Sequence, residues 1–139
     1  MFNQFLARVL SVAFVVLTVG FAVFFHPKEQ SLDVTPIVMA QLRSLRSEPK
    51  LTDLPGAPAA AERQMMEPII NETLDRLIKG LPQHPSKLWV MAQLEPFVAQ
   101  YHLTDTELRE RCSVYVERIL AIVGITSTDG AFYKYLIFI

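Results

Sequence analysis

Hydrophobic and polar positions change character sharply near residue 26 of this 139-residue chain. Residues 9–25 are apolar or small and contain no charged side chain, whereas later residues mix apolar and charged positions. A membrane-spanning helix needs about 20 apolar residues, with a lower limit of about 17. We therefore predict that residues 1–30 form an N-terminal membrane anchor with one transmembrane helix.

A cleaved signal peptide and a buried core helix are the alternatives for this segment. A signal peptide ends in small residues, and Ala22 could serve, although cleavage there would expose Val23-Phe24-Phe25. A soluble helix has a polar face, which this segment lacks. Arg8 and Lys28 flank the segment, so the charge bias that sets its orientation is weak. We expect the N-terminus to stay in the cytoplasm and the domain to lie outside it.

After the anchor, the pattern predicts an all-α domain, a compact bundle of four to five short helices. Residues 31–58 should form a short helix and a linker, and residues 59–139 the helical core. Thr35-Pro36 is typical of a helix start. The expected apolar stripe of this first helix is Ile37, Val38, Met39, Leu42 and Leu45.

The second predicted helix covers residues 59–79, where apolar side chains recur at three- and four-residue steps. Pro68 should kink it or end a short first helix near Glu67, because proline lacks the amide donor. Gly80 is a natural C-cap.

The third and fourth predicted helices are joined by a short turn. Ser86 can cap a helix that runs to Tyr101, whose expected inward residues are Leu88, Met91, Leu94, Val98 and Tyr101. Thr104 and Glu107 have the spacing of a capping box for a helix that ends at Gly124. The apolar tail, residues 131–139, should form a last helix or a short strand that packs on the bundle or on a partner.

Composition removes several classes of function. The net charge of −1 gives no basic surface for nucleic acid. The single cysteine, Cys112, lies in an apolar helical pattern, which favours a buried thiol over a nucleophile. The three histidines are scattered and lack the spacing of metal ligands. We expect no metal, no cofactor and no enzymatic activity.

Asp105 to Arg111 is the dense polar cluster of the chain. Its acidic and basic residues are spaced as the helix pairs Asp105–Arg109 and Glu107–Arg111, so we favour a capped helix start over a recognition patch. If the chain has a partner-binding surface here, its candidate residues are Tyr101, His102, Asp105, Glu107, Arg109, Arg111 and Asp129.

Two motifs resemble a known family. Asp105-Thr-Glu-Leu-Arg-Glu-Arg111-Cys112 and the turn Ser127-Thr-Asp-Gly130, which follows Gly124-Ile125, are similar to those of small bacterial helical proteins, the domain of unknown function numbered 4844. The resemblance covers about residues 45–139. It implies an all-α domain and nothing catalytic. Leu108 departs from the pattern, because an acidic residue is expected there.

These observations lead to one function hypothesis and two alternatives. The chain is expected to be a protein-binding module of the bacterial inner membrane, single-pass through residues 9–25, with its domain facing the periplasm. An immunity protein against an envelope toxin would have this organisation. The alternatives are a structural subunit of an envelope complex and a hydrolase that uses the carboxylates of Asp105, Glu107 and Asp129 as acid and base.

Overall fold

The computed structural model describes residues 27–52, 59–135 and 137. Its elements are α2 (Pro36–Ser47), α3 (Ala60–Gly80), α4 (Lys87–Tyr101), α5 (Thr106–Val123) and the short 3₁₀ helix η1 (Tyr133–Tyr135). These residues form no strand beyond one isolated bridge between Ser31 and Ser86. The prediction of an all-α domain is confirmed. The anchor predicted at residues 9–25 lies outside the described residues, and none of the helices that are described could cross a membrane.

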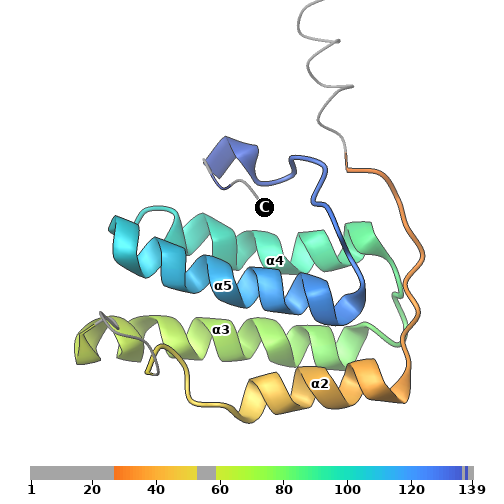
Figure 1. The fold of residues 1–139 in the computed structure, drawn as a ribbon, viewed down its shortest axis with the longest axis horizontal. Helices are drawn as coiled ribbons and strands as arrows, with labels where there is room; N and C mark the ends of the chain where they lie inside the picture. Colours follow the sequence, from red (N-terminus) through yellow and green to blue (C-terminus); the bar gives the residue numbers. More distant parts are fainter. Residues whose placement is uncertain (1–26, 53–58, 136, 138–139) are drawn as a thin grey trace, which may run out of the picture.

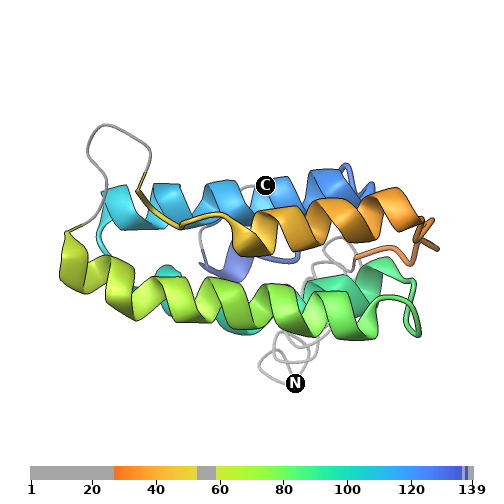
Figure 2. The same cartoon turned by 90° about the horizontal axis from the view of Figure 1, so that it is seen from below.

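The four helices form a bundle in which each helix packs against two others. α2 contacts α3 and α5, and α4 contacts the same two helices. The residues after α5 turn back and cover α4 and α5 on the side away from α2 and α3 (Figure 1). Seen from below, α2 and α3 run side by side along the bundle (Figure 2). The chain enters at Pro27, on the side of the C-terminal segment (Figure 1).

The core lies among the four helices and contains nearly all the apolar positions that the helical spacing predicts to be inward. Six residues that recur at helical spacing along α5 are buried: Leu108, Cys112, Tyr115, Val116, Ile119 and Val123. Two first-turn residues differ. Ile37 is 70% exposed and Leu88 is 41% exposed, so the expectation that both face inward is wrong. Leu88 lines a pocket described below.

Pro68 and Pro96 both lie inside continuous helices, so the predicted early end of a helix near Glu67 is wrong. Each proline removes the amide that would bond the carbonyl four residues earlier, at Gln64 and Ala92. Both prolines and both of these residues are exposed. Water can therefore reach the carbonyl groups, which explains why the helices continue.

The two glycines at helix ends have different roles. Gly124 adopts φ 77° and ends α5, and the amide of Ile125 donates to the Leu120 carbonyl at 2.9 Å, as expected for a glycine C-cap. Gly80 remains the last residue of α3, and Leu81 follows in right-handed helical conformation. A Cβ atom on Gly80 would lie 2.4 Å from the Trp89 ring. Gly80 is therefore required for close packing, and its assignment as a C-cap is wrong.

Lys50, which the sequence places in a loop, is buried at the end of α2. Its Nζ donates to the carbonyl groups of Arg46, at 3.1 Å, and Glu48 at the end of α2. Burial lowers its pKa from the usual value. The next residue, Leu51, has φ 57° and donates its amide to the Tyr115 hydroxyl of α5 at 2.8 Å. The end of α2 is thereby fixed to α5.

Candidate functional site

The residues proposed for partner contact at the end of α4 contribute largely to the fold. Tyr101 is fully buried, and burial raises its pKa to about 12. Its hydroxyl accepts a hydrogen bond from Ser113 at 3.4 Å. The half-buried ring of His102 packs 4.8 Å from the ring of Tyr135, centroid to centroid. Tyr101 is therefore not exposed to a partner.

Asp105, rather than Thr104, is the N-cap of α5. Its Oδ1 accepts the amide of Leu108 at 3.0 Å. The Thr104 hydroxyl instead donates to the carbonyl of Tyr101 at 2.6 Å, at the end of α4. The predicted capping box of Thr104 and Glu107 is wrong by one residue, because aspartate caps as well as threonine and stands next to it.

The charged residues that follow make local contacts along α5. Arg111 Nη2 lies 4.0 Å from Glu107 Oε1, as the spacing predicts. Arg109 Nη2 lies 3.5 Å from the Thr106 hydroxyl, in place of the predicted pair with Asp105. Exposed pairs of this kind contribute less than about 1 kcal/mol to stability.

Asp129 lies at the other end of α4 and joins three segments. Its Oδ2 accepts from Lys87 Nζ at 2.6 Å and from the amide of Lys28 at 2.8 Å. The Lys87 side chain is only 6% exposed. The hydrogen bond from Lys87 and that from Lys28 lower the pKa of Asp129 below its usual value. We call Asp129 with its two lysine partners the clasp.

The hydrolase alternative requires the carboxylates of Asp105, Glu107 and Asp129 in one site, but α4 lies between them. Asp105 follows the last residues of α4, whereas Asp129 contacts its first residue. The 15 residues of α4 span about 22 Å. The structure therefore does not bring Asp129 together with Asp105 and Glu107. A general acid needs a raised pKa, and that of Asp129 is lowered.

Residues 28–32, which we call the strap, are bonded to the domain along their length. The Leu32 amide donates to the Pro85 carbonyl and the Lys87 amide to the Gln30 carbonyl, both at 2.9 Å. The Gln30 side chain also reaches the Gly124 carbonyl at 3.3 Å. The predicted boundary after residue 30 thus falls within a segment that is attached to the domain.

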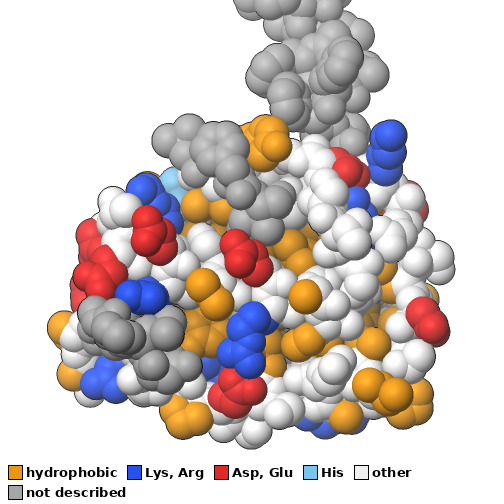
Figure 3. All heavy atoms as spheres, viewed as in Figure 1, with side chains coloured by type: hydrophobic (Ala, Val, Ile, Leu, Met, Phe, Trp, Pro, Cys, Tyr) orange, Lys and Arg blue, Asp and Glu red, His pale blue; other side chains and the backbone are white. Residues whose placement is uncertain are grey.

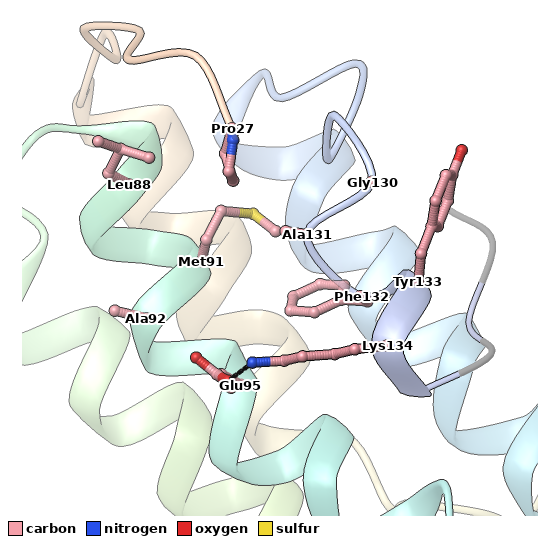
Figure 4. Close-up of a pocket in the computed structure, with 10 residues that line it drawn as sticks. All are labelled: Pro27, Leu88, Met91, Ala92, Glu95, Gly130, Ala131, Phe132, Tyr133 and Lys134. Atoms are coloured by element: carbon pink, nitrogen blue, oxygen red, sulfur yellow. Dashed lines mark hydrogen bonds and ion pairs between the residues drawn. The ribbon is translucent and has the colours of Figure 1, made fainter. Parts of the chain in front are cut away.

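A pocket of about 530 Å³ lies between α4 and the C-terminal segment. It is lined by Pro27, Leu88, Met91, Ala92, Glu95, Gly130, Ala131, Phe132, Tyr133 and Lys134. Figure 4 shows side chains from one stripe of α4 facing residues 130–134 across this space. Pro27, the residue just before the strap, closes one end.

The pocket exists because α4 is apolar on more than one side. Its buried face, which includes Leu94 and Phe97, packs in the bundle core. A second stripe, Leu88, Met91 and Ala92, faces the C-terminal segment; Met91 is buried, whereas Leu88 and Ala92 remain exposed. Phe132 is 1% exposed and fixes this segment against the bundle. In the space-filling view, drawn from the side of α5 and α2, hydrophobic side chains lie among charged ones (Figure 3).

The pocket also offers polar groups. Glu95 and Lys134 form an ion pair across it (Figure 4), and the Tyr135 hydroxyl donates to the same Glu95 oxygen at 3.0 Å. The hydrogen bond from Lys134 lowers the pKa of Glu95, and Glu95 raises the pKa of Lys134. The Ala92 carbonyl lacks its helical donor because residue 96 is proline. A ligand that combines an apolar group with a nearby hydrogen-bond donor would match both the apolar lining of the pocket and its free acceptor.

A family model described as a domain of unknown function, DUF4844, matches residues 33–137. The chain belongs to this family. The resemblance deduced from the two motifs is confirmed, and the match begins earlier than expected, just after the strap. The DUF4844 region contains all of α2 to η1 and every pocket residue except Pro27. No curated protein and no solved structure matches the chain.

Sequence reasoning missed the pocket and the partners of Asp129. The available signal for the pocket was α4 itself, since Leu88 and Ala92 extend its apolar surface beyond one helical stripe. The apolar tail was the second signal, because a single helix with two apolar faces needs two layers to cover it. No local pattern connects Asp129 with Lys28 or Lys87.

Proposed function

We propose that this chain is a membrane-tethered protein-binding module whose docking site is the pocket between α4 and the C-terminal segment. The observation that carries the proposal is an apolar pocket of about 530 Å³ with an exposed apolar rim at Leu88. Ligand sites are typically concave, mostly apolar, and about 300–1,000 Å³ in volume.

The polar groups of the pocket favour a peptide as its occupant. The Ala92 carbonyl can accept a backbone amide, and Glu95 and Lys134 can exchange their mutual contact for polar groups of a partner. A purely hydrocarbon ligand would leave this carbonyl without a donor, and an unsatisfied polar group is unfavourable once water is displaced. An apolar side chain presented by a neighbouring protein satisfies both parts of the site.

The proposed tether restricts where the partner lies. In our proposal residues 9–25 cross the bacterial inner membrane and the domain faces the periplasm. Pro27 lines the pocket, so the docking site would be close to the membrane surface. A partner that reaches it is a membrane or envelope protein, and an envelope toxin neutralised by an immunity protein would be one such partner. A structural subunit would instead stay bound through its anchor or tail, whatever occupies the pocket.

Two tryptophan substitutions, each at an alanine, test the docking site in the full chain. Ala92→Trp places a large side chain in the pocket, whereas Ala40→Trp adds the same side chain to an exposed position of α2. The measurement is covalent cross-linking in membranes followed by identification of captured proteins, with thermal melting of both variants. We expect Ala92→Trp to lose at least one partner that Ala40→Trp retains, at similar melting temperatures. Equal capture by both variants would show that the pocket is not the docking site.

A further inference from the structure

The strap fixes how the domain is attached to whatever precedes it. Residues 28–32 make backbone hydrogen bonds to Asp129, Pro85 and Lys87, and Leu32 is buried. A flexible linker would let the domain move over a distance of about 5–6 Å times the square root of its length. Here one residue, His26, separates the apolar segment from Pro27. With residues 9–25 in the membrane, as proposed above, the domain would have almost no free linker.

The same side of the molecule carries the C-terminal segment. Pro27 and η1 lie on the side away from α2 (Figure 1). Tyr133 is 42% exposed, and in Figure 4 its ring points away from the pocket. Lys28, whose amide belongs to the clasp, is an exposed residue. Tyrosine is enriched where proteins meet the membrane–water interface, because its ring is apolar and its hydroxyl is polar.

From this placement we infer that the face formed by Lys28 and Tyr133 rests on the lipid surface, so that the bilayer itself is the partner of this face. The inference rests on the proposed function, because it requires residues 9–25 to be in the membrane. Lys28 is followed by Glu29, so the face has little net charge. Contact is therefore set by the tether, with weak dependence on anionic lipid. The pocket lies beside this face and stays available to a protein partner.

The test uses the full chain in phosphatidylcholine vesicles that carry a nitroxide on the lipid headgroup. One variant has a fluorophore at Tyr133→Cys, and its control has the same fluorophore at Arg43→Cys on α2, the far side of the bundle (Figure 1). The native Cys112 is buried, so each variant is labelled at the introduced thiol. We expect quenching at position 133 to exceed quenching at position 43 by about threefold or more, since nitroxide quenching requires near contact with the headgroups.

An insertion variant tests the role of the strap. Insertion of about ten Gly and Ser residues between His26 and Pro27 gives a linker with a mean span of about 17 Å, which frees the domain and keeps the anchor. We expect the two positions to become equally quenched. Equal quenching without the insertion, in protein that floats with the vesicles, would overturn the inference. Failure to float with the vesicles would instead overturn the anchor on which the proposed function rests.

Discussion

An aspartate lies near each end of α4, Asp105 at its C-terminal end and Asp129 at its N-terminal end. The two differ in how far away in sequence their hydrogen-bond donors are. Asp105 accepts an amide three residues ahead of it. Asp129 accepts from groups that are 42 and 101 residues away in sequence. The first contact fixes the start of one helix, whereas the second holds the strap, α4 and the C-terminal segment together. An aspartate can thus cap a helix locally or bond residues that are far apart in the sequence, depending on the donors that the fold places beside it.

The largest expected effect comes from Asp129. Asp129→Ala leaves the nearly buried ammonium group of Lys87 without its carboxylate, and an unpaired buried charge is strongly unfavourable. Because the Asp129 side chain is 27% exposed, we expect a loss of about 2 kcal/mol in unfolding free energy, below the range for fully buried pairs. The measurement is urea denaturation of a fragment spanning residues 27–139, which keeps the strap.

The pH dependence of the same fragment separates the charge from the side chain. The pKa of Asp129 is lowered in the folded protein, so its contribution is present above the usual value of 3.8 and is lost as the pH falls below it. Asp129→Asn keeps an acceptor for the Lys28 amide but has no charge. The stability difference between this variant and the native fragment should therefore shrink below pH 3.8. A constant difference would contradict the clasp.

Asp105 should have a smaller effect, because its contact is a single cap. Asp105→Ala is expected to lower the unfolding free energy by about 1 kcal/mol, the usual result for an N-cap. Thr104→Ala should lower it by less, about 0.5 kcal/mol, since the hydroxyl donates to the Tyr101 carbonyl and caps no helix amide at this half-buried position. Urea denaturation of both variants checks the order. A larger loss for Thr104→Ala would restore the capping box predicted from the sequence.

The smallest change is expected from charge reversal on the surface of α5. Arg109→Glu removes one long contact with Thr106 and should change stability by less than about 0.5 kcal/mol. Capture of partners should also be unchanged, because Arg109 does not line the pocket. The check is the cross-linking assay at low and high salt together with thermal melting. A salt-sensitive loss of capture at unchanged melting temperature would make the start of α5 the functional surface.

The sequence predicts those parts of the fold that depend on near neighbours. The spacing of apolar residues locates all four helices, and Gly124 and Ser86 mark a helix end and a helix start correctly. The predictions from sequence are wrong where a tertiary contact overrides a local rule. Gly80 is governed by the Trp89 ring rather than by backbone conformation.

The candidate site depends on contacts that no local rule contains. The pocket is lined by α4, residues 130–134 and Pro27. These segments are far apart in the sequence, so only the assembled fold shows which apolar residues of α4 they leave uncovered. Lys50 shows the same limit, because a lysine in a loop is expected in water until the helix end that it satisfies is placed beside it.

Acylation of the buried amine of Lys50 can report local unfolding of the protein. Acylating reagents reach an amine only when it is exposed, so Lys50 reacts only in molecules in which the end of α2 has opened. Lys79 is exposed and reacts at all times, which provides an internal reference in the same chain. When opening and closing are fast, the ratio of the two reaction rates measures the fraction of open molecules. Mass spectrometry of a partly acylated sample would thus measure local unfolding in the full chain without denaturant.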